Sequence, residues 1–351
     1  MTRETRVLDD TEREIVPFKY SITSYGADYP VDSLVQRLDK DVVVVPAFQR
    51  KYVWTTRQAS RFIESLLLGL PVPGIFLSKE PESGVLLIID GQQRLRTLGG
   101  FYSGILRGKA FALREVQPQF EGKTYKTLTK EERTRLDDSI IHATVVRQDH
   151  PTQDQSSIYH VFERLNTGGT NLQPQEIRAC IFHGEFENLL RDLDENKAWR
   201  EVYGAPSARM KDQELILRFF ALLFDGDKYA RPMKEFMNNF MGVNRDLKHV
   251  AERELRAAFE PTIAIIRDAL GQRAFRPERA LNAAVFDAVM VAVAELLRVH
   301  QNTSPDTIKK RYVSLLDDPD FSTATKTGTS DETNVSLRMK RARAILAGQS
   351  S

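Results

Sequence analysis

Residues 85–98 read VLLIIDGQQRLRTL, and this stretch decides the fold of the N-terminal part of the chain. The apolar run from Val85 to Ile89 predicts a buried strand that ends at Asp90. Apolar residues then recur at helical spacing from Leu95 to Ile105, which predicts an amphipathic helix. The sequence therefore predicts a strand that turns sharply into a helix.

The junction between this strand and this helix is polar. The first N–H groups of a helix have no partner within the helix, and the positive end of the macrodipole lies there. Gly91 lets the main chain come close to a ligand, and Arg94 adds a permanent positive charge. Such a turn suits an anion, most simply a phosphate. An Asp-capped helix with solvated polar residues is the alternative interpretation.

Composition limits the class of protein. The chain has 351 residues, which suggests two domains of about 100–200 residues each. Its 41% hydrophobic and 28% charged residues are typical of a globular protein. The net charge of +2 excludes a globally basic surface, so any DNA contact must come from a local patch.

The sequence also bears on location. The only cysteine, Cys180, allows neither an intramolecular disulfide nor a zinc cluster of cysteines, which fits a reducing cytoplasm, and we expect it to be a small buried residue. The N-terminal residues lack an apolar signal core. Polar residues interrupt the apolar stretch 281–299, which predicts a buried helix and no membrane span.

The elements expected over residues 25–150 are mixed, and those over 151–351 are helical. Residues 1–24 are predicted to be a flexible segment. Strands are expected at 41–45, 75–77, 85–89 and 140–146, and a helix at 58–68 precedes the strand pair 75–77 and 85–89. Further helices are expected at 153–165, 174–192, 211–225, 233–240, 250–271, 281–300, 304–316 and 333–347. Ser304 and Asp212 are the predicted caps of two of them, and residues 323–332 are predicted to form a polar loop.

Two other stretches contain candidate ligand residues. Residues 162–178, FERLNTGGTNLQPQEIR, predict two helices joined by a Gly-Gly turn, which is either an ordinary helix–turn–helix connection or a ligand-binding loop. Residues 48–54, FQRKYVW, place two cations among three aromatic residues, which stack on a base or pack at the edge of a core.

Taken together, these motifs resemble a known family, the N-terminal domain of GmrSD-type restriction endonucleases. The matching stretches are PAFQRKYVW at 46–54, SLLLGLPVP at 65–73, IDGQQRL at 89–95 and FERLNTGG at 162–169. The resemblance extends over about residues 25–240, and includes Asp212-Gln213-Glu214 with Arg218. It implies an α+β fold, distantly related to ParB and sulfiredoxin, followed by a mainly α-helical domain.

The resemblance implies binding, and often hydrolysis, of a nucleoside triphosphate within a bacterial restriction or anti-phage module. In this sequence the phosphate turn would be Asp90, Gly91, Gln92, Gln93 and Arg94, with Gln49 and Arg50 facing it. Further nucleotide contacts are expected from Asn166, Thr167, Gly168 and Gly169. Our hypotheses are that Arg94 and Arg50 neutralise phosphoryl charge, Gln92 or Gln93 orients water, and Asp90 holds Mg²⁺.

Alternative functions remain open at this stage. One is a non-catalytic regulator that binds DNA or a partner and senses nucleotide; another is a DNA nuclease that acts alone. Complete members of the family add a nuclease domain with a His-Asn-His type metal site, whereas the six histidines of this chain are scattered. We therefore expect a separate nuclease subunit as a possible partner, and DNA or a second copy of the chain as others.

The terminal helix has the strongest local cluster of basic residues. Arg338, Lys340, Arg341 and Arg343 lie within six positions of one another. They are either solvated cations near a helix C-terminus or contacts for a DNA backbone.

Overall fold

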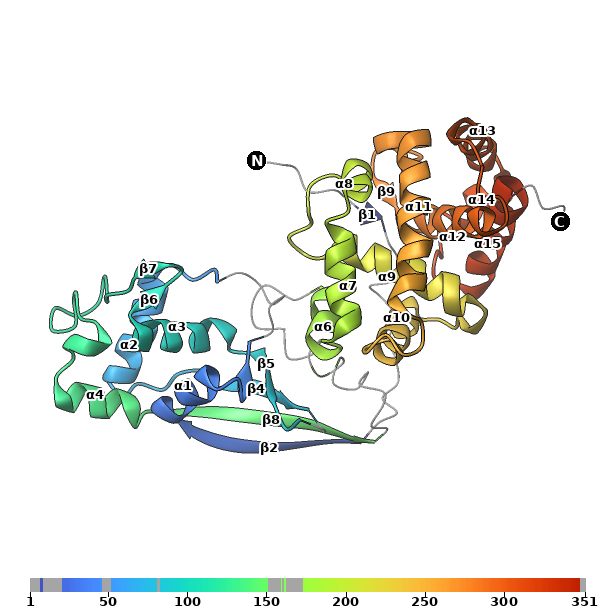
Figure 1. Cartoon of the computed structure of the whole chain (residues 1–351). Coiled ribbons are helices and arrows are strands. Elements are labelled where there is room, and N and C mark those ends of the chain that lie inside the picture. Colours follow the sequence, from blue (N-terminus) through green and yellow to red (C-terminus); the bar gives the residue numbers. More distant parts are fainter. Residues whose placement is uncertain are drawn as a thin grey trace. The chain divides into compact units, whose positions relative to one another are not determined.

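The computed structural model describes residues 7–8, 21–45, 52–80, 83–150, 159, 161 and 173–347 (Figure 1). The chain divides into two compact units, residues 19–171 and residues 1–18 with 172–351. The first is mixed α and β, and the described part of the second is mainly helical. The predicted α+β class, with a mainly helical C-terminal region, is confirmed.

A five-stranded sheet organises the N-terminal unit, in the order β2-β8-β4-β5-β3. Its strands are β2 (Ser21–Pro30), β8 (Ile140–His150), β4 (Ile75–Lys79), β5 (Leu86–Asp90) and β3 (Val43–Val44). The long strands β2 and β8 pair antiparallel and lie side by side in Figure 1. β4 pairs antiparallel with β5 and parallel with β8, and β3 pairs parallel with β5. The predicted strand pair around residues 79–84 is thus confirmed.

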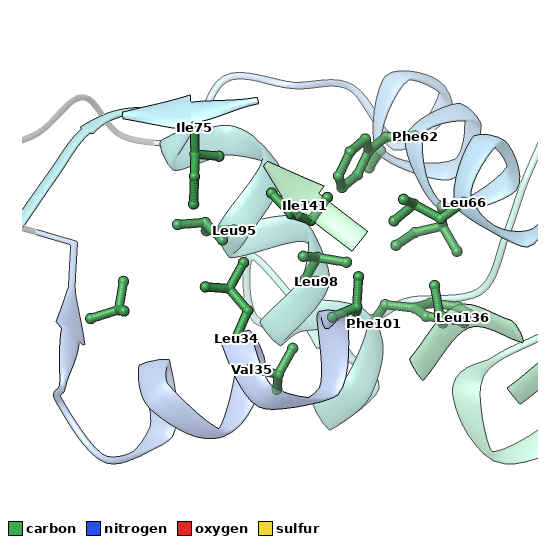
Figure 2. Close-up of a cluster of buried hydrophobic side chains, with 14 of the residues drawn as sticks. Leu34, Val35, Phe62, Leu66, Ile75, Leu95, Leu98, Phe101, Leu136 and Ile141 are labelled. Carbon is green, nitrogen blue, oxygen red and sulfur yellow. The ribbon is translucent and has the colours of Figure 1, made fainter. Parts of the chain in front are cut away.

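The helices α1 (Val31–Asp39), α2 (Thr56–Leu67), α3 (Gln92–Ser103) and α4 (Lys130–Asp137) pack in this unit. The short elements β6 (Ile105–Leu106), β7 (Lys109–Ala110) and η2 (Tyr125–Thr127) complete it. Figure 2 shows apolar side chains of α1, α2, α3 and the sheet gathered in one core, among them Leu34, Phe62, Ile75, Leu95, Leu98, Phe101 and Ile141. This core fixes α3 against the sheet.

The described elements differ from the sequence prediction in instructive ways. The strand expected at 41–45 is shorter because Asp41 has a positive φ of 53° and the N–H of Val42 bonds back to the carbonyl of Arg37. These two residues end the turn after α1 instead of extending β3. Helices α1 and α4 and strand β2 were not predicted. The helix predicted at 58–68 is confirmed as α2, whose capping box at Thr55 and Gln58 starts it two residues earlier.

The described part of the second unit contains the helices α6 to α15 and a two-stranded sheet. The helices are α6 (Pro174–Ile181), α7 (Glu185–Asp194), α8 (Lys197–Tyr203), α9 (Lys211–Asp225), α10 (Met233–Val243), α11 (Glu252–Leu270), α12 (Ala283–Val299), α13 (Pro305–Leu316), α14 (Pro319–Ala324) and α15 (Glu332–Ala347), with the 3₁₀ turns η4 (Gly226–Lys228) and η5 (Gly271–Arg273). β1 (Val7–Leu8) pairs parallel with β9 (Leu281–Asn282).

Several predicted helices of this unit are confirmed, and two details are wrong. The helix expected at 174–192 breaks into α6 and α7 at the extended Gly184, which lies so close to Arg245 that an added Cβ would be 2.6 Å from the Arg245 carbonyl oxygen. Asp212 does not cap α9, since it lies inside the helix and accepts a hydrogen bond from the N–H of Ser207. The predicted cap Ser304 does accept a hydrogen bond from the N–H of Thr307.

Other expectations meet the structure only in part. Of the helix predicted at 153–165, Tyr159 and Val161 alone belong to the described residues, and both are helical. α8 was not predicted, and α14 extends into the loop expected at 323–332. α12 is buried along most of its length, as expected for residues 281–299. Within the described ranges, no helix has both the length and the apolar composition needed to cross a membrane.

Candidate functional site

The turn between β5 and α3 is built around Gly91. This residue has a φ of 102° and a ψ of 7°, in the left-handed region that favours glycine. A Cβ at this position would also lie 2.4 Å from Cγ2 of Ile75. Both the backbone conformation and the packing against β4 therefore demand glycine. The sequence predicted that the main chain at Gly91 comes close to a ligand; in the structure it comes close to the core side chain of Ile75.

The start of α3 lacks the usual stabilising groups of a helix N-terminus. No side chain of the described residues caps it, and its first turn holds no acidic residue. α4 in the same unit has a capping box at Thr129, and Glu131 and Glu132 lie in its first turn. Uncapped N–H groups and the macrodipole both favour a negative charge at a helix start, and the first turn of α3 does not supply one.

Arg94 makes this imbalance larger. Its side chain is 13% exposed and folds back toward the turn, where Nη2 donates to Oδ2 of Asp90 at 2.7 Å. Its Nε is buried without a hydrogen-bond partner in the described part of the chain. A guanidinium in the first turn opposes the helix dipole, and one half-exposed carboxylate is its only ion-pair partner among the described residues. The positive charge of Arg94 therefore lies at the turn, and its contact with a phosphate stays a prediction.

Gln93 links α3 to the segment that precedes α2. Its Oε1 accepts hydrogen bonds from the N–H groups of Val53 and Trp54, at 2.9 and 3.2 Å. Oγ1 of Thr97 lies 2.7 Å from the carbonyl oxygen of Gln93 and 2.7 Å from the hydroxyl of Tyr52. Because the single Thr97 proton is donated to Gln93, the hydroxyl of Tyr52 donates to Thr97. The amide oxygen of Gln93 therefore positions the chain at residues 53 and 54, a role that sequence spacing did not indicate.

The fit of a magnesium ion depends on Asp90. Mg²⁺ commonly binds one or two carboxylates together with water and the phosphates of a substrate. Asp90 is half-exposed at the turn and its Oδ2 is paired with Arg94, which leaves Oδ1 to face a metal or its water. No group of three or more His, Cys, Asp or Glu able to hold a metal ion occurs in the residues that the structure describes. The residues therefore fit an ion that arrives with a phosphate.

Several predicted contacts fall outside the described residues. This holds for Gln49 and Arg50 and for Asn166, Thr167, Gly168 and Gly169. Gln92 is the first residue of α3 and is partly exposed. Cys180, expected to be a small buried residue, is buried and free of any disulfide.

The basic cluster of α15 is largely neutralised. Arg338 is fully buried and donates to Oδ2 of Asp287 at 3.1 Å. Its assignment to DNA is wrong, since a buried guanidinium cannot reach a DNA backbone. Arg341 pairs with Asp318, and Arg343 forms a two-bond pair with Glu295 at 2.7 and 2.8 Å.

Lys340 is the exposed member of this cluster. Contacts of Lys340, Arg341 and Arg343 with DNA stay a prediction. The helical spacing of these residues could not show which carboxylates face each of them.

A cavity that the sequence did not predict lies along α3. It has a volume of about 470 Å³, and we call it the α3 pocket. Its polar lining residues are Asp41, Tyr52, Arg96, Ser103 and Arg107, and Gly99 and several aliphatic side chains complete it. A second cavity of about 460 Å³ shares Gly99 and Ser103 and is lined by the carboxylates Asp32, Asp39 and Asp137.

Tyrosines line the acidic cavity on one side. Tyr102 and Tyr125 stack with ring centroids 4.1 Å apart, and both donate to Asp137, at 2.5 and 3.0 Å. Burial, together with the hydrogen bond to Asp137, raises the pKa of Tyr125 to about 12. Both hydroxyls therefore stay protonated at neutral pH and hold Asp137 in place.

Comparison with known proteins assigns the N-terminal part of the chain. A search of curated proteins found no match. A family model does match residues 31–183, which include α1, α2, α3, α4, α6 and the whole strand–turn–helix described above: it is that of the GmrSD restriction endonuclease, N-terminal domain. The resemblance noted from the sequence is thereby confirmed, because residues 31–183 match the model of the GmrSD N-terminal domain family.

Proposed function

We propose that this chain is the nucleotide-binding component of a DNA restriction or anti-phage module and that it hydrolyses nucleoside triphosphates. The family of residues 31–183 supports the restriction context, because its description names a restriction endonuclease. The strand–turn–helix at residues 90–94 supports the nucleotide. In this proposal the phosphates lie over the start of α3.

A single observation carries the proposal. The start of α3 has a left-handed Gly91, no side-chain cap, no acid in its first turn and an inward-folded Arg94 with a buried, unpartnered Nε. The missing cap, the missing acid and the unpartnered Nε are unfavourable at a helix start, and a bound anion compensates for them; Gly91 permits the tight turn in front of the helix. A triphosphate supplies the charge and the acceptor oxygens that the turn lacks.

The residues of the turn have distinct roles in hydrolysis. Backbone N–H groups of the first turn of α3 and the guanidinium of Arg94 donate to phosphate oxygens, where they stabilise the charge of the transferring phosphoryl group. A bound Mg²⁺ would supply further charge neutralisation and would be held by Asp90, directly or through water. Water attacks the γ-phosphorus, the bond to the β-phosphate oxygen breaks, and the products are a nucleoside diphosphate, phosphate and a proton.

Gln92 is the residue that we assign to the attacking water. Gln93 was the other candidate, but its Oε1 accepts hydrogen bonds from two backbone N–H groups. Orientation of the water needs a carbonyl oxygen that a ligand can reach, so Gln93 is a positioning residue. Its amide connects the phosphate turn to residues 53 and 54.

The test compares phosphate release by variants of the turn. With ATP, GTP, CTP or UTP and Mg²⁺, Arg94→Ala is expected to lower the rate at least about a hundredfold, the effect of losing one donor to a transition-state oxyanion. Gln92→Ala lowers the rate and keeps binding. Arg135→Ala, an exposed change in α4 of the same unit, serves as the control. Equal rates for wild type and Arg94→Ala, with both folded, would remove the proposed role.

The same assay separates hydrolysis from sensing. Gln93 ties the turn to the segment before α2, so a bound phosphate could be reported there without turnover. A chain that binds nucleotide and releases no phosphate is a nucleotide-sensing regulator. Nicking of plasmid DNA by this chain alone would instead identify a nuclease.

A further inference from the structure

We infer that the α3 pocket binds the base and sugar of the nucleotide whose phosphates lie over the start of α3. This inference rests on the proposed function and adds to it the site of the nucleoside. It assigns a ligand to residues outside the turn at 90–94: Tyr52, Arg96, Gly99, Ser103 and Arg107.

First, one face of α3 connects the phosphate turn with the pocket. Gln92, Arg96, Gly99 and Ser103 are spaced by four, three and four positions, and residues with that spacing share a helix face. The last three line the α3 pocket. At 1.5 Å per residue, Gly99 lies about 10 Å along the axis from Gln92. A triphosphate at the helix start therefore brings its nucleoside within reach of Gly99.

Second, the pocket contains a cation, Arg96, that has no partner among the residues described by the structure. Arg96 is partly buried, burial lowers its pKa, and it makes no hydrogen bond or ion pair with the residues that the structure describes. A desolvated guanidinium without an acceptor is costly. Its flat face stacks on aromatic rings and its N–H groups donate to carbonyl oxygens or ring nitrogens. A nucleobase offers both kinds of contact.

Third, Gly99 leaves open space on the helix. A Cβ added there would meet no atom within 4 Å, whereas one added at the neighbouring Gly100 would lie 2.7 Å from Cδ1 of Leu106. Gly100 is thus needed for packing, and Gly99 is not. A glycine inside a helix is destabilising relative to alanine. The bare backbone at Gly99 gives a flat ring a surface to lie on.

The remaining lining fits a nucleoside in size and chemistry. The volume of about 470 Å³ lies within the range of pockets that hold small ligands. Aliphatic walls and the ring of Tyr52 suit the faces of a base, and Asp41 and Ser103 can bond sugar hydroxyls or an exocyclic amino group. Burial raises the pKa of the Tyr52 hydroxyl overall. The positive charge of nearby Arg107 acts in the opposite direction and lowers it. A second positive charge therefore lies at the pocket.

The experiment separates the nucleoside from the phosphates. Isothermal titration calorimetry with Mg²⁺ measures the affinity for each of the four common nucleoside triphosphates and for inorganic tripolyphosphate, which lacks base and sugar. The variants are Gly99→Phe, which fills the pocket, Arg96→Ala, which removes the unpartnered cation, and Arg94→Ala, which alters the phosphate turn. Gly226→Phe, at another glycine with open space, is the matched control in the helical unit.

We expect the wild type to bind at least one nucleotide about tenfold or more tightly than tripolyphosphate. Gly99→Phe and Arg96→Ala remove this difference and leave the affinity for tripolyphosphate unchanged, while Arg94→Ala weakens both. Thermal melts establish that each variant folds, and Arg96→Ala decides the result should Gly99→Phe fail to fold.

Two results would overturn the inference, and they are distinguishable. If tripolyphosphate binds as tightly as every nucleotide, or the folded pocket variants retain the nucleotide advantage, the nucleoside does not lie in the α3 pocket, and the phosphate site stands. If neither tripolyphosphate nor any nucleotide binds to the wild type, the proposed function fails as well.

Discussion

The arginines at the start of α3 and those of α15 look alike in the sequence and differ in the structure. Arg94 has a half-exposed carboxylate as its partner, and Arg96 has none among the described residues. In α15, Arg338 faces the buried Asp287, and Arg343 is held by both oxygens of Glu295. The described carboxylates neutralise the first group less completely than the second, whose charge is balanced mostly by carboxylates of the protein.

This contrast shows what makes a basic cluster functional. A run of arginines has a high charge density in either case, but the field outside the protein depends on the carboxylates that the fold brings beside them. In α15 these carboxylates come from α12 and from the residue before α14, far away in sequence. At the start of α3, one carboxylate of the described residues, that of Asp90, forms an ion pair with Arg94. The predictions below test this difference.

The largest effect is expected from the buried carboxylate of the second cluster. Asp287 accepts from Arg218 at 2.7 and 3.0 Å and from Arg338 at 3.1 Å, and all three side chains are almost fully buried. Asp287→Ala leaves two buried guanidinium groups without that carboxylate. We expect the free energy of unfolding to fall by about 3–5 kcal/mol, measured by urea denaturation.

An exposed carboxylate of the same unit provides the control for Asp287→Ala. Glu201 is about half-exposed, and its ion pairs with Lys197 and Arg267 are at 4.0 and 3.6 Å. Glu201→Ala should cost less than about 1 kcal/mol. Similar losses for the two variants would show that the arginines of α15 do not depend on their buried partner.

A smaller effect is expected at the phosphate turn. Gly91→Ala imposes a side chain on a φ of 102° and places Cβ against Ile75, so stability should fall by about 2–4 kcal/mol. Gly104→Ala, at the other end of α3, has a φ of 79° and open space, and should cost only about 1 kcal/mol. Denaturation of both variants measures the difference. Equal costs would mean that the close packing on β4 does not constrain the turn.

The next prediction concerns a cluster in which carboxylates outnumber cations. Arg200 contacts both Asp194, at 2.6 Å, and Asp212, at 3.1 Å. Burial, and then the negative charge of Asp212, raise the pKa of Asp194 to about 7. In the unfolded chain this pKa is near its ordinary value of 3.8. Between these two values the folded state binds more protons, so stability should rise as the pH falls from 7 toward 4.

Asp194→Asn tests this assignment. The amide has no proton to gain, so the variant should lose the rise in stability over that pH range, measured by urea denaturation at several pH values. An unchanged pH dependence would place the titrating group elsewhere.

The smallest effect is expected on DNA. Arg341 and Arg343 are paired with Asp318 and Glu295, so replacing both by alanine should lower stability only slightly and change the affinity for duplex DNA little. The slope of affinity against salt concentration, from fluorescence anisotropy, measures this. A slope reduced by about two would show two phosphate contacts and support the alternative that α15 binds DNA.

Local patterns predicted much of the fold. The strand pair β4 and β5, the turn at Gly91 and the bounds of α9 follow from runs of apolar residues and from turn residues that lie close together in the sequence. The break at Gly184 could not be predicted, because it depends on Arg245, about sixty residues later. Asp212 looked like a cap for the same reason, since its partner Arg200 belongs to a helix that the sequence did not indicate.

The candidate site was predictable to a similar extent. The proposal that residues 90–94 bind an anion came from the residues themselves, above all Gly91 and Arg94. The role of Gln93 depends on the backbone of Val53 and Trp54, and the α3 pocket depends on β3 and on the turn at Arg107. Such long-range neighbours leave no signal in spacing.

The most direct test of the central claim measures the stability of the N-terminal unit with inorganic tripolyphosphate, at constant ionic strength. The account predicts that the anion stabilises the wild type, by about 2.7 kcal/mol at a hundred times its dissociation constant, and stabilises Arg94→Ala much less. No stabilisation of the wild type, or equal stabilisation of both proteins, would contradict the claim that the start of α3 is completed by a bound phosphate.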